Sequence, residues 1–204
     1  MTIHDAEHIP VDRRSAIIAA YPEHEREARV NGVPMLGSGL IYPYSDESLA
    51  EPALEDVPPH WAKIWGIDFG YEHPFAAVLL AWDKDTDTLH VLHTLKIKGG
   101  PGIGPMQHAA AMKTVAENAP VAWPQDGHQH DKGGGKQLAQ QYKDQGLRML
   151  DHHATWPNGS NSVEAGIEET RLRMETGKLK VARHLSQWFE ERRLYHRKDG
   201  LIVK

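Results

Sequence analysis

Two aspartates stand directly after apolar runs that are typical of buried strands. Asp68 lies in "IWGIDFG", residues 64–70, and Asp126 lies in "AWPQDG", residues 122–127. If the two strands are parallel neighbours in one sheet, their ends meet at one edge and the two carboxylates come close together. Close carboxylates bind a hard divalent cation, and oxygen-only ligands suit Mg²⁺ or Mn²⁺. Two such ions held by acidic residues are a recurrent arrangement for cleaving phosphodiester bonds.

Both aspartates also have a simple structural interpretation. Asp68 can close a turn at the end of its strand, with Gly70 supplying a positive φ, and Asp126 can occupy a β-turn before Gly127. Against this, a carboxylate in a strand covered by helices is costly unless it is paired or bound to a cation. We therefore predict that Asp68 and Asp126 act together as metal ligands and catalytic groups.

A loop rich in histidine and glycine follows the second aspartate. Its sequence is "DGHQHDKGGGK", residues 126–136. His128, His130 and Asp131 could form a zinc site, but His-x-His without a further ligand of known proximity is weak evidence, and a flexible loop is favoured. The segment is no Walker A loop, because no Ser or Thr follows its last lysine, so no nucleotide site is predicted on this chain.

The net charge of the chain does not indicate a nucleic-acid-binding protein. The net charge is −5, so any contact with a polyanion must be local. Basic residues gather in the loop above and at residues 171–183 and 192–198, where solvated surface is the default interpretation. Beside a site that cleaves phosphodiesters they would form a basic surface for DNA. The predicted DNA-contacting residues are Lys132, Lys136, Lys178, Lys180, Arg192, Arg193, Arg197 and Lys198.

Composition excludes several classes of protein. The chain has no cysteine, which excludes disulfides, thiolate metal sites and cysteine nucleophiles. No run approaches about 18 apolar residues, and the first residues lack the pattern of a signal peptide. We therefore expect a soluble, intracellular protein without a membrane partner.

The order of predicted elements indicates an α/β fold. Strands are predicted at residues 62–70, 75–83, 89–97, 121–123 and 147–154, with a turn at 124–127 after the fourth. Helices are predicted at 106–119, 135–146 and 161–177. The last of these helices begins with a capping box of Asn161 and Glu164 and stops at Gly177. Three meandering strands followed by alternating helices and strands predict a mixed sheet, antiparallel at its start and parallel in its continuation.

Residues 1–59 differ from the rest in composition. An amphipathic helix, interrupted at Pro22, is predicted at 11–30, followed by a segment dense in Gly, Pro and Ser that is typical of an extended arm or a linker. We expect this arm to be anchored by Leu36, Leu40, Ile41 and Tyr42. Residues 60–204 form the predicted α/β domain, which is expected to end in a hairpin at "HRKDGLIVK", with Asp-Gly at its tip.

Three segments of the chain resemble the C-terminal nuclease domain of tailed-phage terminase large subunits, of the P22-like headful-packaging kind. They are "WGIDFG", "AWPQDG" and the arm "EREARVNGVPMLGSGLIYP". The resemblance covers the chain from about Glu25 to its end. It implies an RNase H-like fold that cuts DNA with divalent metals held by three acids, the first two matching Asp68 and Asp126. It also implies that the third acid lies beyond Lys204. Weaker candidates within the chain are Asp199, Glu164 and Glu168.

The leading functional hypothesis is a metal-dependent endonuclease that cleaves concatemeric viral DNA during packaging, using two Mg²⁺ or Mn²⁺ ions. By resemblance its partners are double-stranded DNA, the portal protein, the small terminase subunit and an upstream ATPase domain, in the host cytoplasm. One alternative is a non-cleaving module that grips DNA or docks on the portal. Another is an actin-like ATPase domain, whose first strand resembles "GIDFG", although Tyr71 stands where a small hydroxyl residue is usual.

Overall fold

The structure, a computed structural model, describes most of the chain from residue 39 onward. The described residues are 10, 13–14, 17–18, 39–70, 73–130, 135–198 and 201–203. The predicted helix at 11–30 and the predicted anchor Leu36 therefore lie largely outside them. The chain divides into two compact units, Ala50–Leu185 and Met1–Leu49 with Ser186–Lys204, which we call the sheet unit and the terminal unit. The predicted division at residue 60 stays a prediction.

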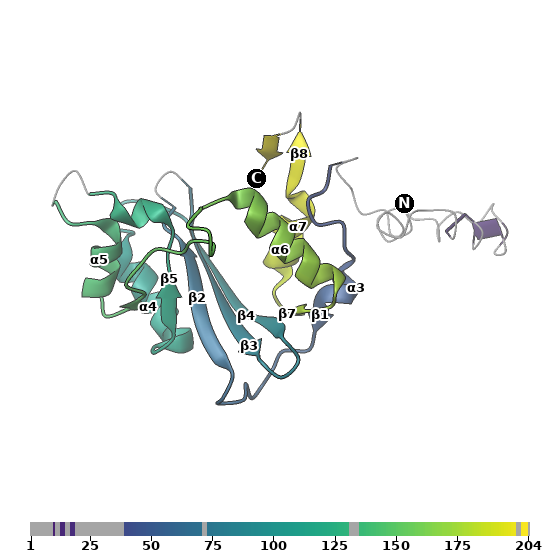
Figure 1. Cartoon of the computed structure of the whole chain (residues 1–204), viewed down its shortest axis with the longest axis horizontal. Helices are drawn as coiled ribbons and strands as arrows, with labels where there is room; N and C mark the ends of the chain where they lie inside the picture. The colour runs from purple at the N-terminus through teal and green to yellow at the C-terminus, as the bar shows by residue number, and fades with distance from the viewer. Residues whose placement is uncertain are drawn as a thin grey trace. The chain divides into compact units, whose positions relative to one another are not determined.

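The sheet unit is built on a mixed sheet of seven strands (Figure 1). The strands are β1 (Ala50–Glu51), β2 (Ala62–Asp68), β3 (Phe75–Asp83), β4 (Thr88–Ile97), β5 (Pro120–Ala122), β6 (Arg148–Met149) and β7 (Leu179–Ala182), in the order β1-β7-β4-β3-β2-β5-β6. Neighbours among β2, β3 and β4 are antiparallel, and every other pairing is parallel. The predicted antiparallel start and parallel continuation are confirmed.

Helices α4 and α5 share the main hydrophobic core with the sheet. The helical elements of this unit are α4 (Pro105–Ala116), the 3-10 helix η2 (Gln125–His128), α5 (Leu138–Asp144) and α6 (Val163–Glu175). Alternate residues of β3, among them Phe75, Ala77 and Leu79, are buried together with Met112 of α4 and Tyr142 of α5. This alternation is the pattern by which a strand presents one face to a core.

Two short strands at one side of the sheet were not predicted. Residues 179–182 look like part of a basic cluster in the sequence, but they form β7, whose Val181 is fully buried between β4 and β1. Residues 50–51, in the range predicted as arm, form β1. Glu51 holds β1 in place, because its carboxylate lies 2.8 Å from Nδ1 of the buried His90 on β4. Neither of these two segments carries a local pattern from which the strand could be recognised.

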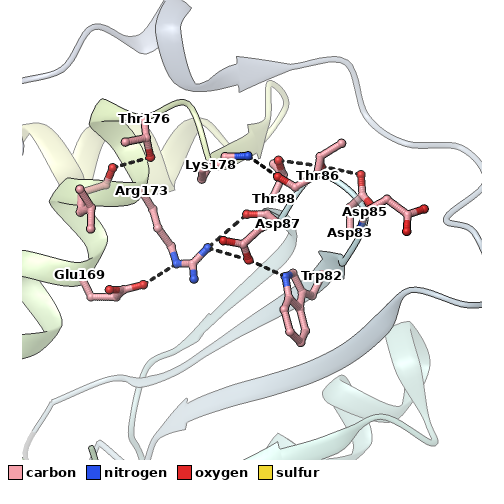
Figure 2. Close-up of polar contacts among 11 residues, drawn as sticks. Trp82, Asp83, Asp85, Thr86, Asp87, Thr88, Glu169, Arg173, Thr176 and Lys178 are labelled. Atoms are coloured by element: carbon pink, nitrogen blue, oxygen red, sulfur yellow. Dashed lines mark hydrogen bonds and ion pairs between the residues drawn. The ribbon is translucent and has the colours of Figure 1, made fainter.

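The turn between β3 and β4 is fastened to α6 and to the segment before β7 (Figure 2). Arg173 of α6 donates to the Asp87 carbonyl at 3.3 Å and to Glu169 at 2.7 Å. Lys178 donates through Nζ to the Thr86 carbonyl. Asp87 also accepts a hydrogen bond from the Trp82 indole at 3.0 Å and has a φ of 52°. The turn is therefore held by polar contacts from residues about 90 positions away in the chain.

The terminal unit contains the elements α3 (Asp46–Leu49), α7 (Ser186–Leu194), β8 (His196–Lys198) and β9 (Leu201–Val203). The antiparallel pairing of β8 and β9 confirms the predicted hairpin, while its tip residues lie outside the described ones. Of the predicted arm anchors, Leu40 pairs with His196, Ile41 is buried, and Tyr42 stacks on Tyr195. In the part of the chain that is described, no helix is long and apolar enough to cross a membrane.

The first turn of α6 offers a test of local structure. Ser162 is the N-cap, and its hydroxyl accepts a hydrogen bond from the Ala165 amide. The prediction that Asn161 caps this helix is wrong, because the next residue, Ser162, is the N-cap, while the Asn161 side chain donates through Nδ2 to Gln125 Oε1 at 2.6 Å. We expect Ser162→Ala to lower the free energy of unfolding by about 1 kcal/mol, measured by urea denaturation. Ser160→Ala, outside the helix, is the matched control, and an equal loss in both variants would contradict the cap.

Candidate active site

The strands that carry the two predicted aspartates are direct neighbours. β2 and β5 run parallel, with Gly66 opposite Ala122. Asp68 is the last residue of β2, and Asp126 lies in η2, which follows β5 after two residues. The expected parallel pairing of these strands is confirmed, and Asp126 lies in a 3-10 helix where the sequence predicts a turn after the short strand. Both residues therefore follow the carboxyl ends of adjacent parallel strands, where ligand sites form in α/β sheets.

The residues that come immediately after the two aspartates pack against each other. A Cβ atom placed on Gly127 would lie 3.0 Å from the Phe69 ring and 2.4 Å from the Trp123 ring. Trp123 is itself held, because its indole N–H donates to the Leu150 carbonyl at 2.7 Å. The absence of a side chain at 127 thus lets the segment that carries Asp126 rest directly on the ring that follows Asp68.

Asp68 closes a turn, as its structural interpretation predicts. The Gly70 amide donates to Asp68 Oδ1 at 3.3 Å, and Gly70 has a φ of 62°. A Cβ on Gly70 would lie 2.5 Å from backbone atoms of Pro74 and Phe75, so only glycine fits. Asp68 is exposed, so the expectation of a costly carboxylate under covering helices is wrong. The turn engages one carboxylate oxygen and leaves the other available to a ligand.

Asp68 and Asp126 offer two exposed carboxylates at this edge of the sheet. Asp126 is exposed like Asp68, and oxygen donors of this kind suit Mg²⁺ or Mn²⁺. Within the described ranges, no group of three or more His, Asp or Glu side chains could hold a metal ion. The donor chemistry of the pair therefore fits a hard cation, and the pair supplies part of a ligand set.

Two of the weaker candidates for a third ligand are described, and they form no metal-holding group with the aspartates. Glu164 and Glu168 are exposed on α6, and the structure does not bring them into a metal-holding group with the two aspartates. Asp199 lies outside the described residues. Of the zinc candidates that the sequence analysis disfavours, His130 pairs through its backbone with Gln137, and Asp131 lies outside the described residues.

One of the predicted DNA-contacting residues has a structural role instead. Arg192 is 7% exposed, and its guanidinium donates to the Tyr42 carbonyl at 2.9 Å and to Asp46 at 2.5 Å. Arg193 shares the same carboxylate but is partly exposed. A buried arginine that is bound within the terminal unit cannot reach a phosphate, so the prediction for Arg192 is wrong.

The other basic residues differ in how available they are. Lys136 is exposed and pairs with Asp144 at 2.8 Å, while Lys178 is engaged by the turn between β3 and β4. Surface pairs such as the first contribute little energy, so they can exchange partners readily. Lys180 and Arg197 are half-buried, Lys198 is exposed, and Lys132 lies outside the described residues.

A buried aromatic cluster beneath the site was missed in the sequence. The Phe69 ring lies 5.1 Å from that of Tyr142, whose hydroxyl is 2.6 Å from His108 Nδ1. His108 stacks on Phe75 with ring centroids 4.0 Å apart. Burial raises the pKa of Tyr142, so the hydroxyl keeps its proton while it is hydrogen-bonded to Nδ1. The signal available in the sequence was a histidine on the apolar face of a predicted helix.

His108 gives the sheet unit a predictable pH dependence. Burial lowers the pKa of His108 below its ordinary value of 6.5. As pH falls below 6.5, His108 takes up a proton in the unfolded chain but not yet in the folded chain. The free energy of unfolding is therefore highest above pH 6.5 and decreases in acid. We expect the loss of unfolding free energy between about pH 7.5 and about pH 5.5 to be smaller in His108→Gln than in the parent.

Urea denaturation at both pH values measures this difference. Burial also lowers the pKa of His93, so part of the pH dependence should remain in the variant. His60→Gln, at an exposed position in the same unit, is the matched control. Equal acid sensitivity in the parent and in His108→Gln would show that His108 is not the group responsible.

Comparisons with known proteins agree with this geometry. Residues 65–204 match the family described as terminase RNaseH-like domain. The large terminase subunits of Salmonella phage P22 and Enterobacteria phage LP7 are each 48% identical to this chain over 205 residues. These alignments cover 100% of this chain but 40% and 42% of the relatives, so the chain spans about two fifths of their length.

Solved structures support the same assignment. The nuclease domain of the P22 large terminase superposes with a TM-score of 0.73 at 45% identity, covering 82% of this chain and 85% of that one. The large terminase of a thermophilic bacteriophage matches in fold alone, with a TM-score of 0.59 at 11% identity over 100% of this chain and 50% of that one. The fold is RNase H-like, as the resemblance implies, and the chain belongs to the family of terminase RNase H-like domains.

Proposed function

We propose that this chain is a metal-dependent endodeoxyribonuclease domain of a terminase large subunit, and that it cleaves concatemeric viral DNA during genome packaging. The observation that carries the proposal is the pair of exposed aspartates, Asp68 and Asp126, at the ends of neighbouring parallel strands. Membership of the terminase family and likeness to a domain named as a nuclease support it.

Asp68 and Asp126 are the residues that we assign to two Mg²⁺ or Mn²⁺ ions. When bound, such ions offset charge on the phosphodiester and lower the pKa of water. The contribution of the chain is to hold the two carboxylates in place. The hydrogen bond from the Gly70 amide orients Asp68, and the packing of Phe69 against Gly127 holds the two segments together. We place the third acidic ligand outside the described residues.

DNA binding would rest on local groups of basic residues, considered within each unit separately, because the chain as a whole is acidic. We retain Lys132, Lys136, Lys180, Arg193, Arg197 and Lys198 as candidate phosphate contacts and give Lys178 lower weight, since its ammonium group already holds a turn. Contacts to phosphates carry no sequence information, so we expect little sequence preference and a strong dependence on salt. The portal protein, the small subunit, an ATPase domain and the host cytoplasm remain proposals from family resemblance.

Nicking of supercoiled plasmid by the purified chain tests the proposal. Open-circular and linear DNA should accumulate in Mg²⁺ or Mn²⁺, and EDTA should prevent this. The control is plasmid incubated with the same ions without protein. If no cleavage occurs with either ion while the chain still shifts duplex DNA in a gel, the non-cleaving DNA-gripping module is the better description.

A further inference from the structure

Two histidines from distant segments meet beside the candidate active site. Nε2 of His128 in η2 lies 3.0 Å from Nδ1 of His153, in the loop that follows β6. Neither side chain is deeply buried: His128 is exposed and His153 is half-buried. The sequence suggests His130 as the neighbour of His128, whereas the fold supplies a partner 25 residues away.

The indole of Trp123 holds the two imidazoles in position. Its ring centroid lies 5.0 Å from that of His128 and 5.9 Å from that of His153. The segment that carries His153 is tied to the same tryptophan twice, because Ala154 N donates to the Trp123 carbonyl at 2.8 Å and the indole N–H donates to Leu150. The pair is therefore positioned by a buried side chain and by backbone contacts, although its members are solvent-accessible.

The spacing of the two nitrogens suits a shared metal ion. Imidazole nitrogens bind Zn²⁺ at about 2.0–2.1 Å, so two of them about 90–110° apart around one ion lie about 2.8–3.4 Å from each other. If the two rings are joined by a hydrogen bond, one of the facing nitrogens must carry a proton. As ligands, both nitrogens need free lone pairs, which the rings obtain by carrying their protons on His128 Nδ1 and His153 Nε2.

We propose that His128 and His153 form a binding site for a borderline transition-metal ion such as Zn²⁺, distinct from the position of hard cations at Asp68 and Asp126. Imidazole suits Zn²⁺, Ni²⁺, Co²⁺ and Cu²⁺, whereas carboxylate oxygens suit Mg²⁺ and Mn²⁺. Within the described residues no group of three or more candidate ligands could hold an ion, so water completes the coordination and binding is reversible.

An ion at this site would restrain the segment that carries Asp126. His128 and Asp126 share the short helix η2, and His153 belongs to a different loop. Bridging the two imidazoles cross-links that helix to the loop. The inference rests on the histidine geometry and does not depend on the proposed nuclease activity.

Calorimetric titration of the full chain with Zn²⁺, in excess Mg²⁺, tests the site without measuring cleavage. The parent should bind one more Zn²⁺ ion than His128→Gln or His153→Gln, and the double variant should lose no more than either single variant. His152→Gln, at the exposed position beside His153, is the matched control and should bind as the parent does. Asp68→Asn should also keep the ion, because the aspartate pair is not its ligand set.

The position of the ion provides a second measurement. Anomalous scattering from a Zn²⁺-soaked crystal should place the metal about 2.0–2.1 Å from both facing nitrogens. Far-UV circular dichroism checks that the variants remain folded. The proposal is overturned if the parent and the double variant bind the same number of ions, or if His152→Gln loses as much as His153→Gln.

Discussion

Asp126→Asn should abolish metal-dependent cleavage while leaving the fold intact. The substitution keeps the shape of the side chain but removes the charge that holds a cation. Metal-ion stabilisation of a phosphodiester transition state is worth several kcal/mol, so we expect the nicking rate to fall about 10²-fold or more. The backbone of η2 should be unaffected, because the hydrogen bond from Gln129 N is accepted by the Asp126 carbonyl and not by its side chain.

Asp68→Asn distinguishes a metal-ligand role of Asp68 from its role in the turn. An asparagine at 68 keeps an Oδ1 that can accept the Gly70 amide, so the turn should survive while the ligand charge is lost. We therefore expect the same loss of nicking as in Asp126→Asn. Asp85→Asn, which removes an exposed carboxylate from the turn between β3 and β4, is the matched control and should cut at the parental rate.

Thermal unfolding completes this comparison. Both aspartates are exposed, and surface substitutions usually change stability by no more than about 0.5 kcal/mol, so all three variants should melt close to the parent. If the two carboxylates were buried together, an Asp→Asn substitution would relieve their repulsion and raise the melting temperature. Because both are exposed, we expect no such increase. If Asp68→Asn cuts at the parental rate, Asp68 is a turn residue only, and the site assignment fails.

Gly127→Ala should destabilise the sheet unit and lower nicking together. The added Cβ would lie 2.4 Å from the Trp123 ring and 3.0 Å from the Phe69 ring, so buried side chains or the backbone must shift. Overpacking of this kind costs about 1–3 kcal/mol. The same shift displaces η2, which carries Asp126, so we expect a reduced cleavage rate even at temperatures where the variant is folded.

Denaturation and nicking measured on the same samples distinguish these effects. A loss of about 1 kcal/mol lowers the melting temperature by about 2–4 °C in a unit of this size. Gly99→Ala is the matched control, because a Cβ on Gly99 would meet nothing within 4 Å. An unchanged melting temperature in Gly127→Ala would show that Phe69 and Trp123 leave room for a Cβ atom at residue 127.

The sequence by itself determined the elements whose pattern is local. β3, β4 and α4 were predicted close to their observed bounds, because alternation over nine or ten residues and a twelve-residue helix carry clear signals. The stop of α6 near Gly177 and the pairing of β8 with β9 were also predictable, since both depend on turn residues. The two motif aspartates could be named because each follows a recognisable strand.

Only the tertiary structure decided which residues meet. β1 and β7 are strands because neighbours pair with them, and nothing in the pattern of their own residues indicates this. The exposure of Asp68, the burial of Arg192 and the meeting of His128 with His153 depend on contacts between distant segments. Such contacts form when the sheet brings strand ends and loops together, so local pattern can propose the residues of a site but cannot say which of them are neighbours.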